Sequence, residues 1–81
     1  MSFDIEWSDD SVRDLNRLEI LLQRRIFKKV NEFAEMESFH GVKRMAGHNT
    51  YRLRVGDYRV IFEMIDGVVN VLKVGHRGKI Y

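Results

Sequence analysis

The chain has 81 residues, of which 44% are hydrophobic and 32% are charged, with a formal net charge of +2 and neither cysteine nor proline. This length allows one domain over residues 1–81, and the lack of cysteine excludes disulfides, thiolate metal sites and cysteine nucleophiles. The longest unbroken apolar runs are three residues, far below the roughly 20 that a bilayer-spanning helix needs, and the first residues show no secretory signal, so we expect a cytoplasmic protein without a membrane partner.

The first half of the chain predicts one strand and then helical structure. Apolar residues alternate with acids over residues 3–7, which is typical of a half-buried strand. Ser8 can cap the following helix, which would have two aspartates in its first turn, where the helix dipole favours acids. An apolar stripe over residues 12–33 fits one long helix or two helices with a break near residues 16–19. We expect a helical hairpin, because it is the more compact arrangement for so short a chain.

The second half predicts a loop and then three antiparallel strands. Residues 38–50 show no period and contain two glycines, as expected of a loop. The dipeptides Gly56-Asp57 and Asp66-Gly67 indicate tight hairpin turns between alternating segments. The strands expected from these signals are Tyr51–Val55, Tyr58–Ile65 and Val68–Val74. This order predicts an α+β fold with an N-terminal strand, a helical hairpin and a three-stranded antiparallel meander, in which the helices pack on one face of the sheet.

The register of this meander can be counted if both turns have two residues. The pairs expected to face each other are Val55 and Tyr58, Arg54 and Arg59, Ile65 and Val68, and Arg59 and Val74. Because side chains alternate between the two faces, one face should form the core and the other should carry most of the charge. The expected core face comprises Tyr51, Leu53, Val55, Tyr58, Val60, Phe62, Met64, Val69 and Val71. The expected charged face comprises Arg52, Arg54, Arg59, Glu63, Asn70 and His76, with apolar Ile61, Leu72 and Val74 among them.

A cluster of arginines on the charged face is the first functional signal. Residues 1–38 carry six Lys or Arg against nine Asp or Glu, whereas residues 39–81 carry eight against three. Like charges at Arg54 and Arg59 would destabilise the strand pair by about 0.2–1 kcal/mol, so folding alone would not select them. Guanidinium groups match the geometry of phosphate and carboxylate, which favours an anion site for a nucleic acid or an acidic protein. The alternative is that the arginines lie along apolar surface and pair with Glu63 or with helix acids.

Further candidate residues follow the last expected strand. Glycines on both sides of the pair His76-Arg77 indicate a sharp turn that could bring Arg77 and Tyr81 beside the sheet arginines. His76 could shuttle protons or serve a structural role. His40 and His48 show no ligand spacing with acids, so we assign no metal and no cofactor.

Three motifs together resemble one known family. The first spans Tyr51–Phe62 and reads YRLRVGDYRVIF, the second is Val-Gly-His-Arg at residues 74–77 followed by the closing Tyr81, and the third is the basic, glycine-ended Lys-Arg-Met-Ala-Gly at residues 43–47. These motifs are similar to those of the RelE/ParE toxin superfamily. The resemblance covers the whole chain in order, from the strand through the helical hairpin to the meander.

The resemblance implies a toxin of a bacterial or archaeal toxin–antitoxin pair. In the RelE branch such toxins enter the ribosomal A site and cut the mRNA being translated, by attack of a ribose 2′-OH on the neighbouring phosphate without a metal. The positions implied to be catalytic are Arg54, Arg59, Arg77 and Tyr81. Those implied to bind substrate are Arg52, His76, Lys43 and Arg44, and contacts to the ribosome would come from Lys28, Lys29, Lys43 and Arg44. The implied partners are a RelB-like antitoxin with an acidic or amphipathic segment, the ribosome and mRNA.

Two departures from the RelE pattern bear on the chemistry. This chain has Arg52 and Arg54 where that branch uses lysines, and a guanidinium is a poor general base, so that role passes to Tyr81 with His76 in reserve. The chain ends at Tyr81 without the extra C-terminal helix of some members, and its terminal carboxylate could engage Arg77. The alternatives to a nuclease are a ParE-like toxin, which poisons DNA gyrase by binding, and an inactive homologue that only binds an antitoxin.

Overall fold

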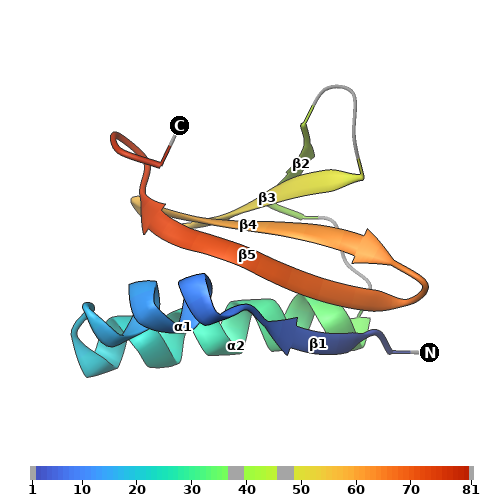
Figure 1. Cartoon of the computed structure of the whole chain (residues 1–81), viewed down its shortest axis with the longest axis horizontal. Coiled ribbons are helices and arrows are strands. Elements are labelled where there is room, and N and C mark those ends of the chain that lie inside the picture. Colours follow the sequence, from blue (N-terminus) through green and yellow to red (C-terminus); the bar gives the residue numbers. More distant parts are fainter. Residues whose placement is uncertain (1, 37–39, 46–48, 81) are drawn as a thin grey trace.

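One mixed sheet and two helices make up the part of the chain that the computed structural model describes, which is residues 2–36, 40–45 and 49–80. In chain order the elements are β1 (Asp4–Trp7), α1 (Asp9–Asn16), α2 (Ile20–Met36), β2 (Val42–Arg44), β3 (Thr50–Val55), β4 (Tyr58–Ile65) and β5 (Val68–His76). The strands follow the order β1-β5-β4-β3-β2, and both helices lie against one face of the sheet (Figure 1). The predicted α+β class, with a helical hairpin on one face, is therefore confirmed.

The N-terminal strand β1 is an edge strand that runs parallel to β5. Ser8 ends this strand and caps α1, because its Oγ accepts a hydrogen bond from the Ser11 N–H at 3.1 Å. The same Oγ donates to the Leu72 carbonyl at 3.0 Å. The predicted cap at Ser8 is confirmed, and it also ties the start of α1 to β5.

The core lies between α2 and the sheet. Phe62 on β4 is 1% exposed, and its ring centroid lies 5.0 Å from that of Phe33 on α2 and 5.5 Å from that of Tyr51 on β3. Buried aliphatic side chains surround these rings: Leu15, Ile26, Val30, Leu53, Val55, Val60, Val69, Val71 and Val74. Most of the face that alternation predicted as the core therefore packs toward the helices.

The hairpin registers agree with the predicted register near the turns and differ from it farther along β5. The pairs found as predicted are Val55 with Tyr58, Arg54 with Arg59, and Ile65 with Val68. A β-bulge then inserts Leu72 as an extra residue on β5. The predicted pairing of Arg59 with Val74 is wrong, since the bulge brings Gly75 opposite Arg59.

The bulge exchanges the faces of the residues that follow it. Val74, predicted on the charged face, is 5% exposed and belongs to the core. His76, also predicted on the charged face, pairs with Tyr58 on the helix-facing side, with ring centroids 5.5 Å apart. Lys73 moves to the charged face in exchange. The physical reason is that burying a valine is favourable by about 1.5 kcal/mol or more, whereas regular alternation would leave Val74 on the open face.

Strand β2 lies where the sequence predicted a loop. It pairs antiparallel with β3, and the facing pairs are Val42 with Leu53, Lys43 with Arg52, and Arg44 with Tyr51. Gly41 begins the pairing with a φ of +78°, which glycine adopts without strain, and its carbonyl accepts the Arg54 N–H at 2.9 Å. The loop prediction is therefore wrong for residues 42–44, because so short a strand depends on its neighbour rather than on a pattern of its own.

The carboxylate of Asp14 on α1 protects the edge of β5 that β1 does not cover. Its Oδ2 accepts the Val74 N–H at 3.0 Å, and the side chain is half-buried. Asp14→Ala leaves that N–H without its acceptor, so we expect the free energy of unfolding to fall by about 1.5–3 kcal/mol. Asp14→Asn keeps a carbonyl oxygen as acceptor, so it should lower the free energy of unfolding clearly less. Urea unfolding followed by circular dichroism measures both variants, and equal losses would show that charge rather than the hydrogen bond is responsible.

Candidate anion-binding site

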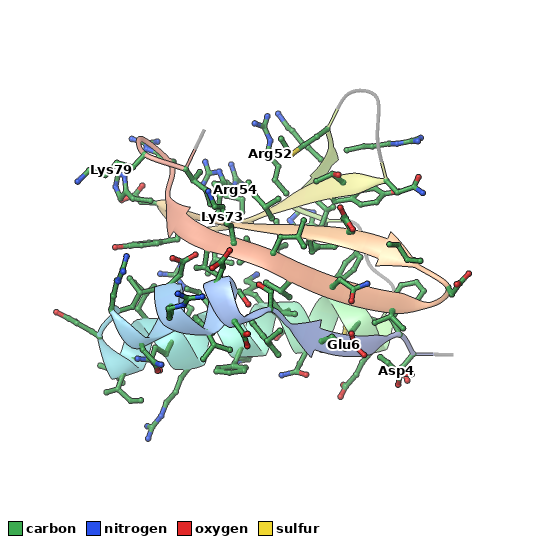
Figure 2. The ribbon with its side chains drawn as sticks, viewed as in Figure 1. Asp4, Glu6, Arg52, Arg54, Lys73 and Lys79 are labelled. Carbon is green, nitrogen blue, oxygen red and sulfur yellow. The ribbon has the colours of Figure 1, made fainter. Side chains whose placement is uncertain are left out.

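The open face of the sheet carries a hollow lined mainly by cations. Its volume is about 320 Å³, and its lining residues are Gly41, Val42, Lys43, Arg52, Arg54 and Arg59. Arg54 and Arg59 are Cα partners across β3 and β4, while Lys43 and Arg52 are partners across β2 and β3. Arg52 and Arg54 project from the sheet on the side away from the helices (Figure 2). The unpredicted strand β2 therefore supplies one wall of this hollow.

A second hollow of about 510 Å³ continues around the end of the sheet. Its lining residues are Arg25, Lys29, His40, Gly41, Arg54, Gly56, Asp57, Arg59 and Arg77. Arg54 and Arg59 line both hollows, so the two form one continuous surface. We call this surface the cationic groove, and its cations are Arg25, Lys29, Lys43, Arg52, Arg54, Arg59 and Arg77.

Backbone carbonyls orient Arg59, and among the described residues no carboxylate neutralises Arg59 or its partner Arg54. Arg59 Nη1 donates to the carbonyl of Gly56 at 3.0 Å and to that of Tyr58 at 2.9 Å. Within the described ranges, neither Arg54 nor Arg59 forms an ion pair with a carboxylate. The alternative in which they pair with Glu63 or with helix acids is therefore wrong for these two residues. Their positive charge remains available to an anion.

The segment after β5 folds back on the side of the sheet away from the helices (Figure 1). The Arg77 N–H donates to the Asp57 carbonyl at 2.8 Å, which ties this segment to the β3–β4 turn. Arg77 Nε lies 3.9 Å from Asp57 Oδ1, and with side chains 63% and 69% exposed this ion pair contributes little. Ile80 packs over Gly75, where an added Cβ would lie 3.3 Å from the isoleucine side chain. These contacts hold Arg77 beside the central arginines.

The remaining predicted site residues lie elsewhere. Arg44 and Lys43 are adjacent on β2 and therefore point to opposite faces, so Arg44 does not line either hollow. His76 is separated from the arginines by the sheet, as the bulge requires. Lys28 is exposed on α2 and also lines neither hollow. Tyr81 lies outside the described residues.

One cation that the sequence did not single out lies at this site, and a second lies on the same face of the sheet outside it. Arg25 on α2 reaches the β3–β4 turn, because a Cβ added to Gly56 would lie 3.3 Å from both of its Nη atoms. Helical periodicity shows only that Arg25 is exposed, so no signal in the sequence could find this contact. Lys73 lies on the open face, where it is the partner of Ile61 on β4, and it lines neither hollow (Figure 2). The sequence contains a signal for this position, because the valines Val71 and Val74 are three residues apart instead of two, which breaks the alternation of the strand.

Neither a metal centre nor a membrane span is indicated in the part of the chain that the structure describes. No three His, Asp or Glu residues there are grouped so that they could hold a metal ion. No described helix combines the length and the hydropathy needed to cross a bilayer. The chemistry that the described site offers is that of guanidinium and ammonium groups, which bind and orient phosphates or carboxylates.

Residues 5–81 match the model of the ParE toxin of type II toxin–antitoxin systems. The chain belongs to this family. The predicted membership of the RelE/ParE superfamily is therefore confirmed, and the protein is a toxin of a toxin–antitoxin system. A comparison with curated protein sequences gives no significant match.

Solved RelE structures are similar to this ParE-family toxin over nearly its whole length. The RelE–RelB complex from Pyrococcus horikoshii OT3 has 28% sequence identity and a TM-score of 0.81, covering 98% of this chain and 99% of that one. The RelB–RelE antitoxin–toxin complex from Methanococcus jannaschii has 29% identity and a TM-score of 0.77, covering 93% of each chain. The intact RelBE complex of E. coli, at 23% identity with a TM-score of 0.77 and 93% and 96% coverage, shows the same fold.

Proposed function

We propose that this ParE-family toxin is a ribosome-dependent endoribonuclease that cuts translated mRNA. The observation that carries the proposal is the cationic groove, where, among the described residues, seven cationic side chains converge and Asp57 is the one carboxylate in the lining. RNA presents a phosphate at every nucleotide, and such a groove binds that backbone by charge. The similarity to RelE structures at 28% and 29% identity supports the same assignment.

In the proposed reaction a ribose 2′-OH gives its proton to a general base, and its oxygen attacks the adjacent phosphorus. The new 2′-O–P bond forms while the P–O5′ bond breaks, and the leaving 5′ oxygen takes up a proton. The products are a 2′,3′-cyclic phosphate, which can be hydrolysed to a 3′-phosphate, and a free 5′-OH. Negative charge builds up on the phosphate oxygens in the transition state, where Arg54, Arg59 and Arg77 stabilise it.

The other roles follow from where each residue lies. Lys43 and Arg52 bind the RNA backbone beside the reacting phosphate, because they line the first hollow. Tyr81 is the proposed general base, on the strength of the family resemblance alone. His76 is the weaker candidate, because it lies on the helix-facing side and its Nδ1 already accepts the Gly78 N–H at 3.2 Å. Lys28 and Arg44, which line neither hollow, are assigned to contacts with the ribosome.

An antitoxin partner is part of the same proposal, since the similar structures from Pyrococcus and Methanococcus are complexes with RelB. We expect a RelB-like segment with acidic side chains to lie over the cationic groove or to add a strand to the sheet. The edge strand β1 carries Asp4 and Glu6, far from Arg52 and Arg54 (Figure 2). Charge therefore favours the β2 edge over the β1 edge for an acidic segment.

A second candidate function is poisoning of DNA gyrase without RNA cleavage. The observation that favours it is the family model matched over residues 5–81, which is that of the ParE toxin. An inactive homologue that only binds its antitoxin is the third reading. These candidates share one fold, so only an assay of activity separates them.

The test is translation of a defined mRNA by purified ribosomes with the toxin added, followed by primer extension to map new ends. The proposal predicts cuts confined to translated codons, with 5′-OH ends downstream, and loss of these cuts in Arg77→Ala. Arg24→Ala is the matched control, because Arg24 is exposed on α2 and lines neither hollow. Intact message together with gyrase-dependent DNA breaks would replace the nuclease by the second candidate. Neither activity would indicate the inactive homologue.

A further inference from the structure

We propose that the second hollow binds a second RNA phosphate, next to the one that reacts, and that Arg25 on α2 is its main ligand. This inference rests on the proposed function, since it extends the same RNA site. No role for Arg25 follows from the sequence motifs.

Arg25 is placed at the end of the sheet by the glycine in the β3–β4 turn. Gly56 has a φ of +58°, and a Cβ there would lie 3.3 Å from both Nη atoms and 3.5 Å from the Cζ of Arg25. The bare Cα therefore leaves room for the guanidinium against the turn. Arg25 has no carboxylate partner among the described residues, so its charge is positioned but not neutralised. Such a group is suited to an anion from outside the chain.

The hollows are arranged so that one chain of phosphates can pass through both. Lys43 and Arg52 belong to the first hollow alone, Arg25 and Lys29 belong to the second alone, and the central arginines belong to both. A phosphate at the central arginines therefore has a neighbouring cationic position on each side. The second hollow, at about 510 Å³, also falls in the range of about 300–1,000 Å³ that holds whole small ligands, which is more than one phosphate group needs.

A nucleic acid fits this arrangement better than an acidic peptide does. An RNA backbone carries one negative charge per nucleotide at regular intervals, and this spacing is complementary to a continuous row of cations. The lining of the second hollow also includes the carboxylate of Asp57, which repels any anion but does not distinguish between the two ligands. The second hollow is continuous with the position of the proposed reacting phosphate, because Arg54 and Arg59 line both hollows, and this continuity favours RNA over an acidic peptide.

The experiment measures binding without cleavage. Uncleavable 2′-O-methyl dinucleotides and trinucleotides, which carry one and two phosphates, are titrated into the purified toxin and followed by NMR between 50 and 200 mM salt. We expect the trinucleotide to bind more tightly than the dinucleotide. Arg25→Ala should reduce this gain in affinity by a factor of roughly three to five. Arg25→Ala should also lower the slope of log K against log salt for the trinucleotide by about 0.7, the value for one phosphate contact on a single strand.

Adjacent and conservative variants make the result specific. Arg24→Ala removes the same charge from the neighbouring position of α2, outside both hollows, and should leave the trinucleotide gain unchanged. Arg25→Lys should keep the salt slope but lose part of the affinity, because it retains the charge without the planar fork. Equal effects of Arg24→Ala and Arg25→Ala, or a trinucleotide that binds no better than the dinucleotide, would overturn the proposal.

A pair of glycine variants tests the same contact without touching a charge. Gly56 and Gly67 both have positive φ, so alanine should strain the two turns alike. Only the Cβ of Gly56→Ala would make a close contact with the Arg25 guanidinium, whereas nothing lies within 4 Å of a Cβ at Gly67. We expect Gly56→Ala, but not Gly67→Ala, to reduce the trinucleotide gain.

Two outcomes distinguish the second phosphate site from the proposed nuclease function and from a site for an acidic protein. Because binding is measured without ribosomes, a toxin that fails to cut mRNA but shows the Arg25-dependent gain would remove the proposed function and leave the second phosphate site in place. A hexaglutamate peptide serves as the competing ligand. Arg25-dependent binding of that peptide, with no gain for the trinucleotide, would assign the hollow to an acidic protein and overturn the RNA proposal.

Discussion

Replacing Arg54 by alanine is expected to lower the single-turnover rate of mRNA cleavage on the ribosome by about 100-fold to 1,000-fold, as loss of one preorganised charge donor does in other enzymes. Arg54 is central to the groove because it lines both hollows and has no carboxylate partner within the described ranges. Its charge is therefore free to stabilise the transition state. The fold should not suffer, since Arg54 is exposed and faces a like charge on Arg59.

The stability of Arg54→Ala provides the internal control for this prediction. Removing one of two facing arginines should leave the free energy of unfolding unchanged or raise it by up to about 0.5 kcal/mol. The cleavage rate is thus expected to fall while the free energy of unfolding is kept or slightly raised. Arg54→Lys, which keeps a charge, should retain more activity than alanine, and Arg24→Ala should retain all of it. Cleavage by Arg54→Ala at the unsubstituted rate would remove Arg54 from the reacting phosphate.

Replacing Phe62 by alanine is expected to cost about 3–5 kcal/mol of the free energy of unfolding. The side chain is 1% exposed, and its ring contacts those of Phe33 and Tyr51 at the centre of the core. The cost comes from lost transfer energy, from the cavity and from the lost ring contacts. Domains of this size hold only about 5–15 kcal/mol in total, so the melting temperature should fall by roughly 15 °C or more.

Phe27→Ala is the matched control for Phe62→Ala. Phe27 makes a comparable ring contact, with its centroid 4.7 Å from that of Trp7, but it is 40% exposed on α2. Water already reaches this side chain, so the same chemical change should cost about 1 kcal/mol. Thermal and urea unfolding of both variants measure the difference. Similar losses at the two positions would contradict the assignment of Phe62 to the centre of the core.

Strand pairing near the turns could be predicted because it depends on local backbone geometry. Asp66 and Gly67 have φ values of 50° and 77°, as a tight two-residue hairpin turn requires, and Gly56 has a φ of 58°. Each turn starts the pairing of its strands at the next residue, so the facing of Arg54 and Arg59 follows directly. The centre of the candidate site was therefore accessible from the residue pattern alone.

The outer parts of the site were not accessible, because they depend on contacts between distant segments. The wall at Lys43 exists only because β3 offers an edge for β2. Arg25 reaches the groove only because α2 passes close to Gly56.

The amino-acid sequence by itself determined the types of the main elements, the cap at Ser8, the turns and the facing arginines, because each depends on residues close together in the chain. The tertiary structure alone decided that β1 lies parallel beside β5, that His76 lies behind the sheet, and that Arg25 joins the anion site. These features have no local cause, since burial and steric fit between segments tens of residues apart select them.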